Sequence, residues 1–393
     1  MGANELLAEL ADIGRTRSGG YSRLSWDPAT MELREWFGSQ AIAAGFELTE
    51  DGNGNQVAWW GHGDDALLLG SHLDSVPDGG PLDGPLGIAS SLAALAQLRS
   101  QGWQPARPIA LANFSDEEGA RFGVACLGSR LATGAIEPDA ALALRDADGT
   151  SLGEVMRARG RDPLAAGTAD WLNRVEYYVE LHVEQGRWLA PAGEPVGVAS
   201  AIWPHGRWRL DFSGQGNHAG ATAMVERHDP MLTYAAAVLA ARELALDSGQ
   251  RATIGKVQVN PGSTNSIPSR VTAWLDARAE SGAELDGLVA GIIARAETAA
   301  REDGTTVEAR ADSTTAAVTF DPARQHRLAS LLDAPVLPTG AGHDAGILAA
   351  RVPTAMLFVR NPTGISHAPE ESATEEDIDA GVDALARVIR DLG

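Results

Sequence analysis

Five side chains that bind metal ions in proteins stand at or next to the carboxyl ends of predicted strands in this chain of 393 residues. Neutral imidazole and carboxylate groups suit zinc and neighbouring divalent ions, and one shared carboxylate can bridge two ions. The residue types therefore predict a site for one or two divalent metals; the alternative is that each side chain only caps a helix or shapes a turn. The five residues are His72, Asp83, Glu118, His182 and His367.

The adjacent pair Glu117-Glu118 adds acid–base chemistry to this prediction. Because the pair follows a predicted strand, both side chains can reach one cleft if the chain turns there. One carboxylate would then bind a metal while its neighbour takes a proton from a bound water. Divalent ions lower the pKa of such a water and polarise a carbonyl group, which is the chemistry of metal-assisted amide hydrolysis. The alternative is a solvated acidic turn.

Strands and helices must bring these side chains together. Apolar runs predict strands that alternate with helical segments, which indicates an α/β fold with a mostly parallel sheet between helices. Ligands bind beyond the carboxyl ends of the strands in such a sheet, so the five side chains are expected to converge there. The strands are predicted at 66–71, 109–114, 177–183 and 354–359, and helices at 86–100, 322–332 and 344–350.

The sequence pattern changes near residue 200. Between 206 and 311 the predicted elements follow the order β-α-β-β-α-β, which is typical of a ferredoxin-like α+β domain. The first pattern resumes after residue 311. The chain is therefore predicted to contain a catalytic domain in two parts, 1–199 and 312–393, with a second domain inserted at 200–311.

The charge balance argues against two kinds of partner. Asp and Glu number 53 and Lys and Arg number 31, which gives a formal net charge of −22 at pH 7. A surface of this charge repels phosphate backbones and anionic lipids. We therefore expect neither a nucleic acid nor a membrane as partner.

The single cysteine, Cys126, excludes an intrachain disulfide and a Cys-rich zinc site. Its apolar run predicts a small buried side chain, although a thiol nucleophile stays open as an alternative. The N-terminal segment lacks the basic and apolar regions of a signal peptide, so the protein is expected in the cytoplasm.

Seven longer motifs are spread over nearly the whole chain: GSHLDSVPDGGPLDGPLG, FSDEEGARF, LHVEQG, GQGNHAGATAM, NSIPSRVTAWLDAR, GAGHDA and GISHAPEE. Together they resemble the hydantoinase/carbamoylase-type amidases, which include N-carbamoyl-L-amino-acid hydrolases, β-ureidopropionases and allantoate amidohydrolases. This family belongs to the aminoacylase/carboxypeptidase clan of dinuclear metallohydrolases. The resemblance implies a catalytic α/β domain with an inserted lid and dimerisation domain.

The resemblance also implies how the metal ligands are divided. His72 and His182 would bind one divalent ion, Glu118 and His367 the other, and Asp83 would bridge the two. Zinc is the first expectation for both ions, and manganese, cobalt and nickel tolerate the same ligands.

Three further positions match catalytic residues of the family. Glu117 would be the general base that activates the attacking water and later protonates the leaving nitrogen. Asp74 would orient the imidazole of His72. His218 would polarise the scissile carbonyl from the partner subunit, so that each active site would need a homodimer.

Four positions match substrate contacts of the family. Gln185 is expected at the ureido or amide end of the substrate, and His343 is expected to help build the pocket. Asn265 and Arg278, on the inserted domain, would clamp the substrate carboxylate. Arginine suits this task because its planar guanidinium donates two hydrogen bonds to a carboxylate.

These inferences predict a homodimeric, dinuclear metal amidohydrolase that cleaves a linear C–N bond of a carboxylate-bearing ureido compound. An N-carbamoyl-L-amino acid is the leading substrate, giving the amino acid, CO2 and ammonia. Allantoate or another N-acyl or amide compound is the alternative substrate. The alternative of another class is a non-catalytic protein that binds metal or solute on the same scaffold.

Overall fold

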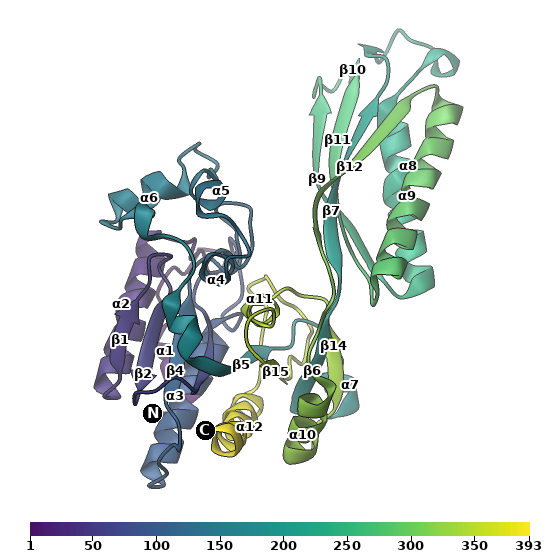
Figure 1. Ribbon diagram of the computed structural model, residues 1–393. Helices are drawn as coiled ribbons and strands as arrows, with labels where there is room; N and C mark the ends of the chain where they lie inside the picture. Colours follow the sequence, from purple (N-terminus) through teal and green to yellow (C-terminus); the bar gives the residue numbers. More distant parts are fainter. The chain divides into compact units, whose positions relative to one another are not determined.

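The chain folds into two compact units, one inserted into the sequence of the other. Unit 1 comprises Met1–Ala201 and Thr319–Gly393, and unit 2 comprises Ile202–Val318. The computed structural model describes residues 1–393 (Figure 1).

A nine-stranded sheet forms the centre of unit 1. Its four middle strands are parallel neighbours in the order β4-β3-β5-β15, and antiparallel strands flank them on both sides. The mostly parallel sheet predicted from the sequence is therefore confirmed. The middle strands are β3 (Ala66–His72), β4 (Ile109–Phe114), β5 (Val175–Val183) and β15 (Thr354–Val359), and the flanking ones are β1 (Glu47–Glu50), β2 (Gln56–Trp60), β6 (Val196–Ile202), β13 (Val318–Thr319) and β14 (Val336–Thr339).

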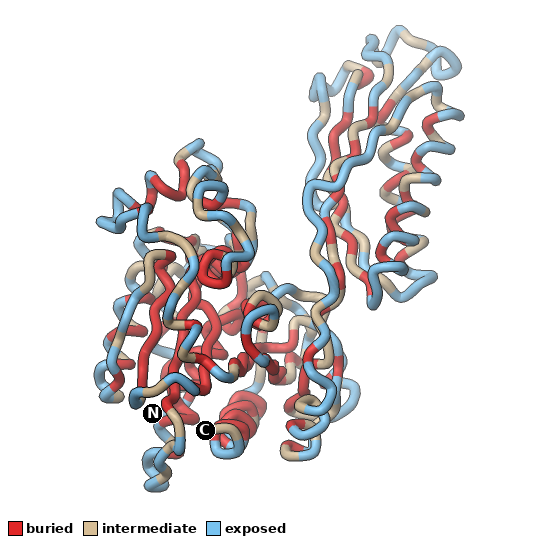
Figure 2. Tube along the Cα trace, viewed as in Figure 1, coloured by how far each residue is buried: buried red, intermediate tan, exposed pale blue.

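Helices cover both faces of the middle strands, which is why β3, β4 and β15 are buried along their whole length (Figure 2). On one face, side chains such as Leu67 and Leu181 join a core with the helices α1 (Ala3–Glu9), α3 (Pro85–Ser100) and α12 (Glu375–Leu392). Successive side chains of a strand point to opposite faces. Accordingly Glu180, next to Leu181, faces α11 (Asp344–Leu348) and accepts a hydrogen bond from Ala345 N.

Unit 2 is a four-stranded antiparallel sheet with two long helices on one face (Figure 1). The sheet order is β12-β7-β11-β9. Apolar side chains of β7 and β11 pack against both helices in a separate core. The order of these six elements along the chain is β-α-β-β-α-β, as the sequence predicts. They are β7 (His205–Ser213), α8 (Pro230–Ser248), β9 (Arg251–Asn260), β11 (Arg270–Arg278), α9 (Gly282–Asp303) and β12 (Thr306–Thr315).

Two short strands complete the unit, β8 (Asn217–His218) and β10 (Ser266–Ile267), which pair with one another. Across the whole chain, no helix has both the length and the apolar composition needed to cross a bilayer.

Candidate metal centre and active site

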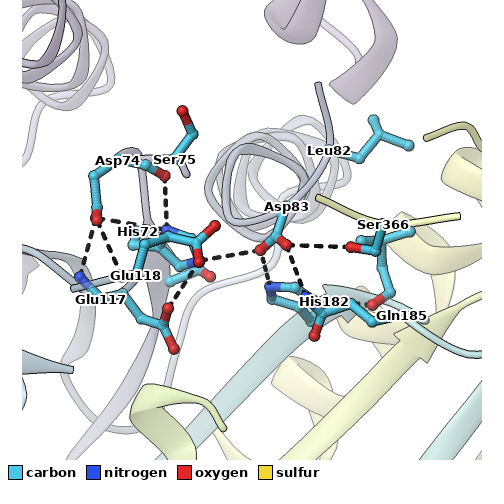
Figure 3. A network of polar contacts seen from close by, with 12 residues as sticks. His72, Asp74, Ser75, Leu82, Asp83, Glu117, Glu118, His182, Gln185 and Ser366 are labelled. Atoms are coloured by element: carbon cyan, nitrogen blue, oxygen red, sulfur yellow. Dashed lines mark hydrogen bonds and ion pairs between the residues drawn. The ribbon is translucent and has the colours of Figure 1, made fainter. Parts of the chain in front are cut away.

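The carboxylate of Asp83 lies among three imidazoles and a second carboxylate in unit 1 (Figure 3). Its Oδ1 is 3.4 Å from His72 Nε2 and 3.1 Å from His182 Nε2. Its Oδ2 is 3.1 Å from His367 Nε2, which in turn lies 3.4 Å from Glu118 Oε2. Each oxygen of Asp83 therefore faces a different set of ligand atoms. The five side chains predicted to bind metal ions do converge.

The parallel strands explain this convergence. In the register of the sheet His72 at the end of β3 is level with Phe114 at the end of β4, and His182 of β5 is level with Phe358 of β15. All these strands therefore end at one edge of the sheet. Asp83 approaches this edge from the start of α3, where Gly84 has φ +84°. A Cβ at Gly84 would lie 2.5 Å from His72 Cε1, so glycine allows the close approach.

The orientation of the buried histidines fits a cation. His72 Nδ1 lies 3.0 Å from Asp74 O, and His182 Nδ1 lies 2.9 Å from Val183 O. A carbonyl oxygen only accepts, so Nδ1 of each ring carries a proton, and when the ring is neutral the lone pair of Nε2 faces Asp83. Both Nε2 atoms are buried without a hydrogen-bond partner. A lone pair that faces a carboxylate oxygen in a buried site is unfavourable unless a positive charge lies between the two atoms.

The pKa values of two further side chains also indicate that the site favours positive charge. Hydrogen bonding to Asp83 raises the pKa of His367 to about 9, although partial burial opposes this shift. Burial, aided by the negative charge of Asp83, raises the pKa of Glu118 to about 7. The negatively charged site thus favours a bound cation, and a divalent metal ion would supply the charge that protons supply in its absence.

The acid–base candidate, Glu117, lies beside the candidate metal ligands. Its Oε2 is 3.8 Å from His72 Nε2, and its Oε1 accepts a hydrogen bond of 3.3 Å from Cys126 Sγ. Burial raises the pKa of the Glu117 carboxyl well above its usual range, against the opposing effect of His72. Cys126 is buried, as predicted, and burial raises the pKa of its thiol. Its contact with Glu117 was not foreseen.

Asp74 connects the turn that carries Glu117 and Glu118 to the ring of His72. Its Oδ1 accepts from Glu117 N and its Oδ2 from Glu118 N, both at 3.1 Å. The same Oδ1 lies 3.6 Å from His72 Nδ1. One buried carboxylate thereby contacts both the candidate base and two candidate metal ligands, Glu118 and His72.

Two of the predicted substrate contacts lie at the same centre. Gln185 Nε2 donates to Asp83 Oδ2 at 2.7 Å and lies 3.4 Å from His367 Nε2. The ring of His343 is buried, and its centroid lies 4.4 Å from that of His182. Both side chains therefore contact candidate metal ligands, Gln185 at Asp83 and His343 at His182.

The remaining predicted residues belong to unit 2, where they lie in two places. His218 and Asn265 are neighbours, because Ala219 N donates to Asn265 O at 2.9 Å and β8 pairs with β10. Arg278 is the last residue of β11 and forms an ion pair of 2.9 Å with Asp276. At about 3.3 Å per residue, β11 separates Arg278 from the Asn265 end by roughly 26 Å. The structure therefore does not bring Asn265 and Arg278 of one chain together.

Two side chains that touch this centre, Ser366 and Glu371, were not predicted from the sequence. Ser366 Oγ lies 3.3 Å from Asp83 Oδ2, and Glu371 accepts from Asp83 N at 3.0 Å. The available signal was their place in the motif GISHAPEE, but the motif alone does not distinguish Glu371 from its exposed neighbour Glu370.

Comparisons with known proteins agree with this geometry. The family model described as "Peptidase family M20/M25/M40" matches residues 68–391. The chain is 37% identical over 401 residues to the N-carbamoyl-L-amino acid amidohydrolase of Geobacillus stearothermophilus, with 98% of this chain and 97% of that protein covered. It is 31% identical over 410 residues to the allantoate amidohydrolase of Escherichia coli (strain K12), with 99% and 97% covered.

Solved structures with the same fold come from similar enzymes. The crystal structure of AtUAH in complex with (S)-hydroxyglycine matches with a TM-score of 0.88 at 28% identity, covering 99% of this chain and 96% of that one. An amidase of the hydantoinase/carbamoylase family from Burkholderia multivorans matches with a TM-score of 0.87 at 31% identity, covering 99% and 97%. The chain belongs to the M20/M25/M40 peptidase family and is a metal-dependent amidohydrolase of the carbamoylase and allantoate amidohydrolase type.

Proposed function

We propose that this enzyme hydrolyses the linear C–N bond of a carboxylate-bearing ureido compound, and that its substrate is an N-carbamoyl-L-amino acid. The products would be the amino acid, CO2 and ammonia. The observation that carries the proposal is Asp83, whose two oxygens face two different sets of ligands beside the buried carboxyl of Glu117. The relative at 37% identity, an N-carbamoyl-L-amino acid amidohydrolase, supports this choice of substrate.

Two divalent metal ions would be held at this centre, with zinc as the first candidate. His72 and His182 would hold one ion and Glu118 and His367 the other, with Asp83 shared between them. When bound, such ions lower the pKa of a water and polarise the carbonyl that it attacks. Manganese, cobalt and nickel suit the same nitrogen and oxygen ligands.

Glu117 would perform the proton transfers of the reaction. Its carboxylate takes a proton from the attacking water and then delivers it to the leaving nitrogen of the substrate. Burial favours the protonated carboxyl that exists between these two steps. The hydrogen bond from the Cys126 thiol holds the carboxylate of Glu117, and the bond from Glu117 N to Asp74 holds its backbone.

We further propose that unit 2, predicted as 200–311, serves as a lid and as the dimerisation domain. Three leucines recur every seven residues along α8 and are 48–66% exposed, which makes an apolar stripe on this helix. Such a stripe suits pairing with a second copy of the chain, because two copies would cover one another's apolar surface. The leucines are Leu232, Leu239 and Leu246.

A dimer would also account for the separation of the substrate-binding residues. If His218 polarises the scissile carbonyl in the partner's active site, Asn265 must also lie at that site, because the two residues are neighbours. Arg278 lies opposite His205, close in sequence to the junction with unit 1 at Ile202. The substrate carboxylate would then be bound by Arg278 of one subunit and by the partner's Asn265.

Allantoate is the alternative substrate, supported by the relative from Escherichia coli at 31% identity. A non-catalytic role is not favoured, because the proposed base and all five ligands are present in one cluster.

Release of ammonia from ureido compounds, and of the free amino acid from N-acetyl amino acids, tests the proposal in a panel of purified substrates. The panel contains N-carbamoyl-L-amino acids with different side chains, their D enantiomers, allantoate and N-acetyl amino acids, each with zinc, manganese, cobalt or nickel. We expect the highest kcat/KM for an N-carbamoyl-L-amino acid. Faster release from allantoate would reassign the substrate, and release from neither class would overturn the proposal.

A further inference from the structure

A buried carboxylate outside the metal ligands ties together two loops that carry them. Glu371 is 3% exposed, and its Oε2 accepts hydrogen bonds from Leu82 N at 2.8 Å and from Asp83 N at 3.0 Å. These bonds join segments that are almost 290 residues apart in sequence. They fix the backbone of Asp83, the residue whose carboxylate both metal sites share.

The second oxygen of Glu371 holds the other loop. Ser366 Oγ lies 2.8 Å from Glu371 Oε1 and 3.3 Å from Asp83 Oδ2. A hydroxyl has a single proton, and the shorter distance indicates that it is donated to Glu371. Ser366 directly precedes His367, so Glu371 is connected through one bond to the loop of that ligand.

Gly80 provides the space for this carboxylate. A Cβ at Gly80 would overlap both Oε2 and the Cβ of Glu371. The loop that leads to Asp83 is thus built to admit the side chain of Glu371, and any larger residue at position 80 would displace it.

The loop of His367 needs such support more than the other histidines do. His72 and His182 stand on buried strands, and a carbonyl fixes each ring. His367 stands in a loop with φ +56°, an uncommon conformation for a residue with a side chain, and its side chain is 47% exposed. Its position relative to Asp83 therefore depends on the contacts made by its neighbours.

We infer that Glu371 is a positioning residue that sets the distance between the Asp83 loop and the His367 loop, and with it the metal site formed by Asp83, Glu118 and His367. This inference rests on the proposed dinuclear centre. Glu371 acts through these ligands and touches neither ion nor substrate.

Zinc binding to the full-length, metal-stripped protein tests this inference by calorimetry and metal analysis. Wild type is expected to bind two ions per chain. Glu371→Ala should bind the first ion normally and the second at least tenfold more weakly. Glu370→Ala is the matched control, because its side chain is exposed, and it should bind as wild type does. Gly80→Ala should resemble Glu371→Ala although the carboxylate is still present.

A conservative variant separates positioning from charge. In Glu371→Gln the amide oxygen can accept from Leu82 N and Asp83 N while the amide nitrogen donates to Ser366 Oγ. We therefore expect Glu371→Gln to retain the affinity for the second ion, and Ser366→Ala to weaken it by a smaller factor than Glu371→Ala.

Wild-type affinity for both ions in Glu371→Ala would overturn the inference, as would a loss in Glu371→Gln as large as in Glu371→Ala. If Glu371→Ala does not fold, the affinities of Glu371→Gln, Ser366→Ala and Gly80→Ala for the second ion test the inference instead. Wild type that binds fewer than two ions would instead refute the dinuclear centre itself.

Discussion

Cys126 donates a hydrogen bond from its thiol to Glu117 Oε1, and both side chains are buried. Because Cys126 N also donates to Glu117 O, only the side-chain bond is lost when the thiol is removed. A thiol is a weak donor, so the loss should cost about 1 kcal/mol of transition-state stabilisation, or roughly fivefold in kcat. We expect this fall in Cys126→Ala with little change in KM, measured by steady-state kinetics.

Serine provides the control for this prediction. Cys126→Ser retains a hydroxyl donor near Glu117 Oε1 and should keep most of the wild-type kcat. Equal losses of kcat in Cys126→Ala and Cys126→Ser would show that the packing of the sulfur matters rather than its hydrogen bond.

Glu117→Gln should abolish most of the turnover without loss of metal. The amide has the same shape as the carboxyl but cannot take a proton from water, and general-base catalysis contributes about 10²- to 10⁴-fold. We expect kcat to fall within this range while metal content stays at the wild-type value. Glu118→Gln is the contrasting variant, because it removes a proposed ligand and should lower metal content. Near-normal turnover in Glu117→Gln with metal bound would exclude Glu117 as the base.

The convergence of the five candidate metal ligands was predictable from the sequence, because the ends of the strands that carry most of them can be recognised in it. The buried runs at 109–114 and 354–359 have the bounds of β4 and β15, and the strands that end in His72 and His182 are equally apolar. Once a parallel sheet is inferred, its carboxyl edge gathers these side chains. The strands β6 and β14 were not predicted, because short segments with Ala, Gly or Pro have a weak β-propensity.

Contacts made by loops were not predictable in the same way. Three residues around the centre, Asp116, Cys126 and His367, have φ between +55° and +56°. Glycine normally marks such positions, and none of these three residues is a glycine, so the sequence does not show that the backbone is left-handed there. The separation of Asn265 from Arg278 follows from the extended strand β11, which lies between them in the motif NSIPSRVTAWLDAR.

Removal of metal should destabilise unit 1. The buried Nε2 atoms of His72 and His182 would face Asp83 without a divalent ion, and a ligand that binds only the folded state stabilises it in proportion to the logarithm of its concentration. We expect calorimetry of the chelated enzyme to show a lower melting temperature and no activity, both reversed by added zinc. Asp83→Ala should show no response to zinc. A melting temperature independent of zinc in wild type would contradict a buried metal site.

Asp211 should make the stability of unit 2 depend on pH. Burial raises the pKa of Asp211, but hydrogen bonds from Arg209, Thr272 and Arg270 outweigh this effect and lower it to about 2. Because the side chain is only 16% exposed, solvent screens little of this pKa shift. The shift contributes about 2 kcal/mol to the free energy of unfolding at pH 7. Since the folded-state pKa is the lower one, this stabilisation is present above pH 4 and is lost as the pH falls towards 2.

Amide hydrogen exchange of β7 and β11 in the full-length protein measures this effect. Asp211→Asn should lower the free energy of opening by about 2 kcal/mol at pH 7, and the difference from wild type should shrink between pH 4 and pH 2. Glu308→Gln is the control, because Glu308 lies opposite Asp211 on β12 and is exposed. It should cause no loss. A difference between Asp211→Asn and wild type that does not change with pH would rule out titration of Asp211 as its cause.

Hybrid dimers test whether His218 acts across a subunit interface. His218→Ala and Glu117→Gln chains carrying different tags are co-expressed, and the heterodimer is isolated by two successive affinity steps. If the partner supplies His218, one of its two sites contains Glu117 of one chain and the intact His218 of the other, while the second site lacks both. We therefore expect about half the wild-type kcat from the heterodimer and little from either parental homodimer. A heterodimer as inactive as its parents would place His218 in the active site of its own chain, and failure to isolate any heterodimer would argue against the proposed dimer.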